Sequence, residues 1–404
     1  MFRYRSIRLL NCAFLLLTGL VFSATAADLR DMGAMSAMAA KSRPALGSAA
    51  AFAPDGRLFA VSRQGGHLML YVSQDEGAHW RAQSVINAQP EVVSAEGENR
   101  PKLAFAQDGG ILVSWTRPMS KPYSGEIRLA RSDDGLRFAD PITVHRHRAE
   151  ITHRFDSLQV GPDGRVVVAW IDKRDLEAAK ANGKEYRGAA IYAAQSRDGG
   201  RSFAVEQKVA DHSCECCRIA VSTDPDGAPV LMWRHVFAPN ERDHALVRLN
   251  EAGRPEKVIR VTHDRWRLDG CPHHGGSLAI APDGTRHAVW FNIKAGEPHV
   301  FYGRLPASDG EQAQGQRAVG GARAEHADLA LAGKHVVVAW KEFDGQRSRL
   351  YAEQSTDGGQ TFAAPVELAS TEGESDHPRT LSRGTALFAF WNTEREGMRV
   401  FPLP

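Results

Sequence analysis

The chain has 404 residues and a nearly balanced charge, with 50 Lys and Arg residues, 48 Asp and Glu residues and a formal net charge of +2. Proteins that bind nucleic acids usually carry a clear basic excess, so this composition indicates no nucleic-acid partner. The length would ordinarily predict two or three domains, but an all-β architecture can hold such a chain in one domain. The internal repeats decide between these possibilities.

The N-terminus has the layout of a cleaved secretory signal. Three arginines precede an apolar run over residues 9–22, and small residues follow at 24–26. This order predicts a signal peptide over residues 1–26, which would remove Cys12 with it. The mature chain, residues 27–404, is then expected to be one domain without stable membrane insertion, located in the periplasm or secreted. It has 47 basic and 48 acidic residues.

Glycines punctuate the mature chain at intervals of 49–63 residues, and a β-rich segment follows each one. They are Gly56, Gly109, Gly164, Gly227, Gly284, Gly333 and Gly384. The first five follow an aspartate, and Asp-Gly supplies the positive φ angles that a tight hairpin requires. A tryptophan comes six or seven residues after every glycine but the first. We expect these residues to pack between neighbouring sheets: Trp115, Trp170, Trp233, Trp290, Trp340 and Trp391.

A second repeated element has the pattern Ser-x-Asp-x-Gly-x-x-aromatic. It occurs at residues 73–80, 196–203 and 355–362, and a fourth copy at 131–138 lacks the leading serine. The pattern predicts a hairpin in which the aspartate accepts backbone N–H groups and the glycine takes a positive φ. The aromatic ring is expected to fill the space below. The predicted role is structural.

These four segments resemble the Asp-box (BNR) repeats of the sialidase (neuraminidase) superfamily. The resemblance implies an all-β fold, a β-propeller of four-stranded antiparallel blades around a central channel. It also implies that the Asp-Gly turns join first and second strands, and that the Asp-boxes join third and fourth strands. Seven glycine turns predict seven blades, whereas six is the familiar sialidase number. The last repeat, residues 376–401, has room for three strands, so residues 28–43 are expected to supply its fourth strand.

Antiparallel order places both kinds of turn on one face of the propeller. The opposite face is then formed by residues just before each first strand and just after each second strand, and many of these are Arg, His or Cys. Such a ring is a candidate binding site, although loop residues are commonly polar in any case. Guanidinium groups pair well with carboxylates, so a small anionic or glycan ligand is expected. The predicted ligand-binding residues are Arg63, Arg100, Arg154, Arg218, His326, His377 and Arg379.

The sialidase resemblance implies a catalytic site with three arginines, a tyrosine nucleophile paired with a glutamate, and an aspartate acid/base. The tyrosine is expected before a late first strand, but residues 376–379 contain none. Tyr302 and Tyr351 fall within predicted third strands, and Tyr186 lies in a long loop. No catalytic residue is therefore assigned. A sialidase-type exo-glycoside hydrolase remains the alternative function if the protein is an enzyme.

A cluster of cysteines and histidines has no counterpart in the sialidase pattern. Cys214, Cys216 and Cys217 precede one first strand, and Cys271, His273 and His274 precede the next. Thiolate and imidazole ligands together suit copper or zinc. The alternative is a disulfide that links the two blades through Cys271.

The sequence thus predicts an exported, sialidase-like propeller that binds a soft metal ion or a small anionic ligand at a channel mouth. A second alternative is a structural or protein-docking propeller with disulfides. No protein partner is identified.

Overall fold

The computed structural model describes residues 45–403, which are almost entirely β-strands and turns. The helix among these residues is α2 (Arg174–Ala181). No helix in this part of the chain is long and apolar enough to cross a membrane. The predicted signal peptide, Cys12 and the strand expected from residues 28–43 lie outside the described residues.

The first half of the described chain forms consecutive antiparallel hairpins. One sheet contains β1 (Ala49–Phe52), β2 (Leu58–Gln64), β3 (His67–Ser73) and β4 (Arg81–Val85). The next contains β5 (Lys102–Phe105), β6 (Ile111–Pro118), β7 (Gly125–Ser132) and β8 (Ile142–Thr143). A larger sheet contains β9 (His153–Val160), β10 (Val166–Asp172), β11 (Ala189–Ser196), β12 (Gln207–Ser213), β13 (Ala220–Thr223), β14 (Pro229–Phe237), β15 (Glu241–Arg248) and β16 (Ile259–Arg260).

The second half repeats the same plan. One sheet contains β17 (Ser277–Ile280), β18 (Arg286–Lys294), β19 (Glu297–Leu305) and β20 (Gln314–Val319). The next contains β21 (Ala324–Ala332), β22 (His335–Phe343), β23 (Ser348–Ser355) and β24 (Val366–Thr371). The last described sheet has three strands, β25 (Arg379–Arg383), β26 (Ala386–Thr393) and β27 (Gly397–Leu403).

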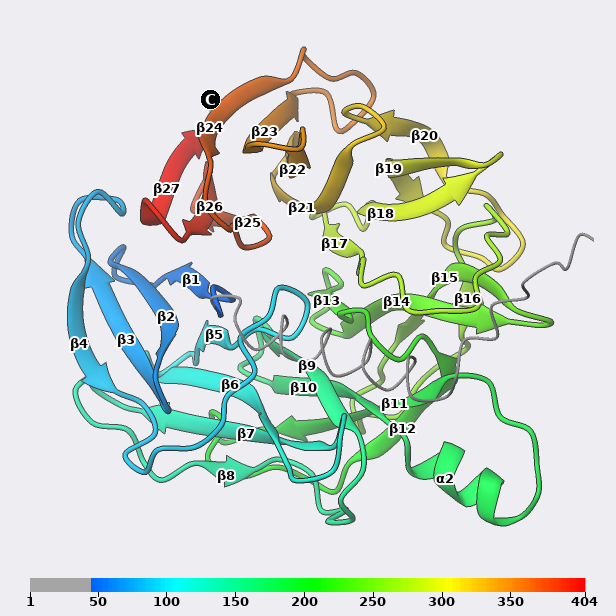
Figure 1. The fold of residues 1–404 in the computed structure, drawn as a ribbon, viewed down its shortest axis with the longest axis horizontal. Helices are drawn as coiled ribbons and strands as arrows, with labels where there is room; N and C mark the ends of the chain where they lie inside the picture. Colours follow the sequence, from blue (N-terminus) through cyan, green and yellow to red (C-terminus); the bar gives the residue numbers. More distant parts are fainter. Residues whose placement is uncertain (1–44, 404) are drawn as a thin grey trace, which may run out of the picture. The chain divides into compact units, whose positions relative to one another are not determined.

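The sheets lie side by side around a common centre (Figure 1). The strands nearest the centre are β1, β5, β9, β13, β17, β21 and β25, each of which contacts the next, and β25 contacts β1. The eight-stranded sheet consists of two four-stranded units, which are joined where Ser213 of β12 pairs with His235 of β14. Residues that precede the central strands are thereby brought close together from distant parts of the sequence.

The two kinds of turn occupy the predicted places. Asp55-Gly56 joins β1 to β2, and Gly56 has a φ of +86°. The segment 73–80 joins β3 to β4, and its Asp75 carboxylate accepts the backbone N–H of His79 (2.9 Å). These local hydrogen bonds form the hairpins that the repeats predict.

The fourth Asp-box corrects one detail of the sequence interpretation. Ser132 takes the role of the leading serine, because its Oγ accepts the Gly135 N–H (2.8 Å) and lies 3.1 Å from Asp134 Oδ1. This copy has one residue fewer between serine and glycine than the other copies. The serine is therefore shifted by one position rather than lost.

The repeated tryptophans form the core between neighbouring sheets, as predicted. All six are at most 1% exposed. Trp115 of β6, for example, packs in one apolar cluster with Val61 of β2 and Leu70 of β3. Burial of such large side chains at each sheet boundary is a main source of stability in this fold.

Candidate functional site

Three cysteines meet directly after β12. The backbone N–H of Cys214 donates to the Arg234 carbonyl of β14 (2.8 Å), which carries the segment from one four-stranded unit to the next. The Cys214 Sγ lies 3.8 Å from the Sγ atoms of both Cys216 and Cys217. All three side chains are buried. The structure thus brings these three predicted metal ligands together.

Cys271 and His273 lie beside the same group. Their ligand atoms and the Cys216 Sγ all lie within 4.8 Å of one another. In contrast to Cys216, Cys271 and His273 are exposed. His273 has a φ of +54°, an uncommon backbone conformation for a residue other than glycine. The cluster therefore has a buried half after β12 and an exposed half before β17.

The structure does not support the disulfide alternative. All four cysteines in the described chain are free thiols. A disulfide requires the two sulfur atoms to lie about 2.05 Å apart, whereas the Cys214 Sγ is 3.8 Å from each of its two neighbours. The thiols are close enough to share a ligand and too far apart to be bonded.

Positive charge lies next to the buried thiols. Arg242 Nη1 is 3.5 Å from the Cys214 Sγ. Hydrogen bonds from the thiols of Cys216 and Cys217 hold the pKa of Cys214 well below its usual range, and the charges of Arg234 and Arg242 lower it further. Cys214 is therefore suited to act as a thiolate, the form that binds metals.

His274 turns away from the cysteines. Its ring stacks on Phe291 at a centroid distance of 4.1 Å and on His326 at 4.3 Å. His326 in turn stacks on His377 at 3.4 Å. The segment 271–274 therefore contributes to two different clusters.

Glu98 completes the second cluster. Its Oε1 lies 3.4 Å from Nδ1 of His377 and 3.6 Å from Nδ1 of His326. Its Oε2 accepts the backbone N–H groups of Arg218 and Gly275, both at 3.0 Å. Oε1 and both Nδ1 atoms are buried and have no hydrogen-bond partner within the described residues.

The charge states in this second cluster follow from its burial. Burial lowers the pKa of His377 to about 3 and that of His274 to about 2, and it also holds the pKa of His326 well below its usual range. Burial alone would raise the pKa of Glu98, but the nearby Arg218 charge and the two imidazoles outweigh it and keep this pKa well below the usual range. Neutral imidazoles thus face a carboxylate.

Local backbone features aim these side chains inward. Glu98 lies in a turn closed by the Asn99 N–H, which donates to the Glu96 carbonyl (2.8 Å). A Cβ atom at Gly97 would overlap the His377 ring. His326 has a φ of +53° and lies where the pairing of β21 with β22 shifts register. Such bulges commonly redirect side chains near functional sites.

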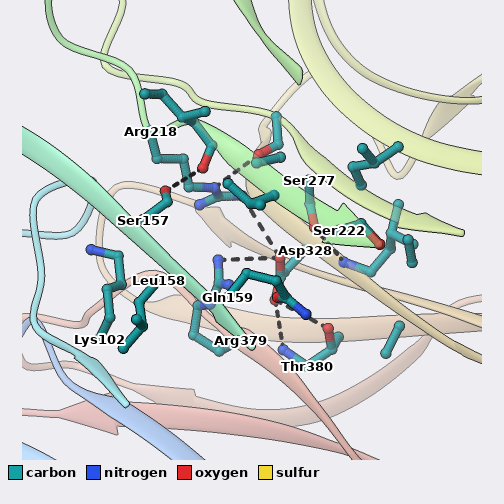
Figure 2. A pocket seen from close by; sticks show the side chains of 18 of the residues that line it. Lys102, Ser157, Leu158, Gln159, Arg218, Ser222, Ser277, Asp328, Arg379 and Thr380 are labelled. Atoms are coloured by element: carbon teal, nitrogen blue, oxygen red, sulfur yellow. Dashed lines mark hydrogen bonds and ion pairs between the residues drawn. The ribbon is translucent and has the colours of Figure 1, made fainter. Parts of the chain in front are cut away.

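A polar cavity of about 350 Å³ adjoins Glu98 between the central strands. Figure 2 shows Arg218, Arg379 and Lys102 around it, with Asp328 between the two arginines. Arg379 Nη1 lies 3.2 Å from Asp328 Oδ1. Burial lowers the pKa of Lys102 to about 8.

The predicted arginines do not form one clamp. Arg100 lies at the cavity but pairs with the buried Asp376 carboxylate (2.9 Å). Arg63 Nη1 donates to the Val93 carbonyl (3.2 Å), and the Arg154 guanidinium lies over the Phe155 ring. Neither Arg63 nor Arg154 lines the cavity. The guanidinium groups of these three arginines therefore contact other parts of the protein rather than one shared ligand position.

The tyrosines considered as nucleophiles lie elsewhere. Tyr302 is buried and its hydroxyl lies 2.7 Å from Nδ1 of His287. The Tyr186 hydroxyl donates to Asp211 (2.6 Å), and that of Tyr351 donates to Glu367 (3.3 Å). None of these three tyrosines lines the central cavity.

Sequence reasoning missed three residues at the second cluster and the cavity: Glu98, Lys102 and Asp328. Glu98 lies one residue before Asn99-Arg100, which does stand out as polar at the start of a repeat. Lys102 begins the central strand β5, and Asp328 lies within the central strand β21. A search of those strands for charged residues would have found both.

Comparisons with known proteins support the fold. No protein-family model matches the sequence, and no curated protein does. A PL25 ulvan lyase is 10% identical with a TM-score of 0.56, and the match covers 89% of this chain and 92% of that chain. A protein of unknown function from Dyadobacter fermentans is 14% identical with a TM-score of 0.52, and the match covers 78% and 96%. An α-L-arabinofuranosidase from Fusarium graminearum is 13% identical with a TM-score of 0.50, and the match covers 78% and 95%.

The chain therefore has a β-propeller fold, as predicted. At such low identity, the likeness extends to the fold alone. Membership of the sialidase superfamily stays a prediction.

Proposed function

We propose that this protein is an exported propeller that binds a soft metal ion, copper(I) or zinc, through Cys214, Cys216, Cys217 and Cys271. His273 is the adjacent imidazole donor. The observation that carries the proposal is the convergence of uncrosslinked thiols from two separate segments.

The sulfur spacing fits a metal coordination sphere. Four thiolates bound tetrahedrally at about 2.3 Å from a metal lie about 3.8 Å apart along each edge of the tetrahedron. The Sγ atoms of Cys216 and Cys217 each lie 3.8 Å from the Cys214 Sγ. The three buried thiols therefore need little movement to bind such an ion, whereas Cys271, whose Sγ lies within 4.8 Å of the Cys216 Sγ, must move closer to join them.

Positive charge beside the cluster also favours a thiolate at Cys214. Arg234 and Arg242 offset the negative charge that several thiolates bring together. The three buried cysteines are enclosed by apolar residues such as Ile191 and Trp233. A bound metal would protect these thiols from oxidation in an oxidising compartment.

The test is metal binding by the full mature protein, reduced and loaded with zinc or copper(I). Wild-type protein should bind one ion through sulfur ligands, and Cys216→Ser should lose this sulfur-bound ion, because Cys216 belongs to both halves of the cluster. Ser213→Ala is the matched control, since Ser213 is a buried neighbour that offers no thiol. Reduced wild-type protein that binds neither ion would refute the proposal.

The second candidate is binding of a small anionic or glycan ligand in the central cavity. It is supported by Arg379 and Lys102, which both line the cavity. The matching test is titration with a model sialoside. Binding that is lost in Arg379→Ala, without hydrolysis, would favour this candidate over a sialidase-type hydrolase.

We also propose that the propeller has seven blades, with the three-stranded sheet β25–β27 as the last. Support comes from the seven central strands that contact one another in sequence order and from the contact between β25 and β1. An experimental structure with six blades would refute this count.

A further inference from the structure

We infer that Glu98, His326 and His377 form a second metal site, which binds a divalent first-row ion through nitrogen and oxygen atoms, with His274 as an additional nearby imidazole. This inference goes beyond the proposed soft-metal site and uses different residues. It rests on the convergence of side chains that precede or begin four central strands.

The donor spacing is suited to one ion. Ligands bound tetrahedrally at about 2.1 Å from a metal lie about 3.4 Å apart. Glu98 Oε1 lies 3.4 Å from His377 Nδ1 and 3.6 Å from His326 Nδ1. The same distances are long for hydrogen bonds, and none of the three atoms has a hydrogen-bond partner in the described part of the chain. One metal ion would satisfy all three once the rings of His326 and His377, which stack nearly parallel at 11°, turn so that both Nδ1 atoms point at it.

The protein holds the carboxylate in place through its other oxygen. Glu98 Oε2 accepts the N–H groups of Arg218 and Gly275, so Oε1 is directed towards the histidines. Arg100 donates to the carbonyls of Gly97 (2.8 Å) and His377 (3.1 Å) and thereby fixes the backbone on both sides. Such outer contacts orient ligands at metal sites.

The chemistry of the donors distinguishes the two sites. Imidazole and carboxylate ligands suit divalent ions of intermediate softness, whereas thiolates prefer soft ions. The positive charge of Arg218, 3.6 Å from Glu98 Oε1, opposes a cation, so binding relies on the two imidazole nitrogens. Segment 271–274 places Cys271 and His273 at one site and His274 at the other.

Cobalt(II) is the probe, because a thiolate ligand gives an intense charge-transfer band that imidazole and carboxylate ligands lack. We expect reduced wild-type protein to bind two equivalents of cobalt. Glu98→Gln and His377→Gln should each lose one equivalent and keep the charge-transfer band. His335→Gln is the matched control, because His335 contacts Gln354 in another part of the fold.

A variant that keeps every ligand provides an independent test. Gly97→Ala places a methyl group against the His377 ring. It should weaken binding of the band-free equivalent, the cobalt ion that binds without a charge-transfer band, by ~10- to 100-fold. Circular dichroism and the Tm of each metal-free variant establish that it is folded.

The outcomes separate this inference from the proposed function. Loss of the band-free equivalent in Glu98→Gln supports the second site even if no protein shows a charge-transfer band. Cobalt stoichiometry that is unchanged in folded Glu98→Gln and His377→Gln would overturn it.

Discussion

The thiol cluster and the imidazole cluster differ in origin, although segment 271–274 serves both. Three of the four thiols lie within four residues of one another, in a single loop after β12 that brings their Sγ atoms together. The imidazole cluster is assembled from separate loops that precede β5, β17 and β25 and from the start of β21. Three of the four thiols need only their own loop to be formed, and Cys271 joins them from the loop before β17, whereas every ligand of the imidazole cluster depends on how the sheets are placed around the centre. The two should therefore respond differently to changes in the framework.

Removal of Arg100 should show this difference most strongly. Arg100→Met leaves the Asp376 carboxylate buried without its partner and should lower the free energy of unfolding by about 3–5 kcal/mol. It also removes the hydrogen bond to the His377 carbonyl, so the band-free cobalt equivalent should weaken. Urea unfolding and cobalt titration measure both effects. If Arg100→Met weakened cobalt binding at the thiol cluster as much as at the imidazole cluster, the distinction between a local and an assembled site would fail.

Removal of Arg242 should have the opposite pattern. Its guanidinium lies 3.5 Å from the Cys214 Sγ and stabilises the thiolate. Arg242→Ala should weaken soft-metal binding by ~10-fold or more, and it should leave cobalt at the imidazole cluster unchanged. Competition with a copper(I) or zinc chelator measures the first effect. Arg254→Ala, a change to an exposed arginine, controls for the loss of one positive charge.

Removal of the Glu206 carboxylate should have a smaller effect, a change in the stability of the fold at low pH, and should leave metal binding at both clusters unchanged. Burial raises the pKa of Glu206, but the backbone N–H groups of Arg146 and His147 and the Arg174 side chain outweigh it and lower this pKa from 4.5 to about 2. The ionised form is therefore favoured by folding, and its stabilisation is complete above pH 4.5 and lost as the pH falls towards 2.

Glu206→Gln should accordingly reduce stability at pH 7 by about 1–2 kcal/mol and flatten the decline between those pH values. Glu185→Gln controls for the loss of one carboxylate. Urea unfolding as a function of pH measures both variants, and a decline of the same steepness in Glu206→Gln and wild type would contradict the assignment.

The framework was predictable because its signals repeat. Gly56 and its six counterparts mark hairpins, and Trp115 and its counterparts mark buried sheet boundaries, so each copy supports the others. The shifted serine of the fourth Asp-box escaped detection because one missing residue breaks the fixed pattern.

The sites were only partly predictable because they break the repeat. Cys214, Cys216 and Cys217 are visible as a group because they are neighbours in sequence. Glu98 could not be paired with His377 from sequence, since their meeting depends on the closing contact between β25 and β1. No sequence pattern indicated that His274 stacks on Phe291 and His326, or that His273 beside it has a positive φ.

X-ray absorption at the metal edge of stoichiometrically loaded protein tests the soft-metal site most directly, because it identifies the atoms bound to the ion and their distances. For zinc-loaded, reduced wild-type protein we predict three or four sulfur ligands at about 2.3 Å, and fewer in Cys216→Ser. A first shell made only of nitrogen and oxygen atoms would contradict the proposed thiolate site.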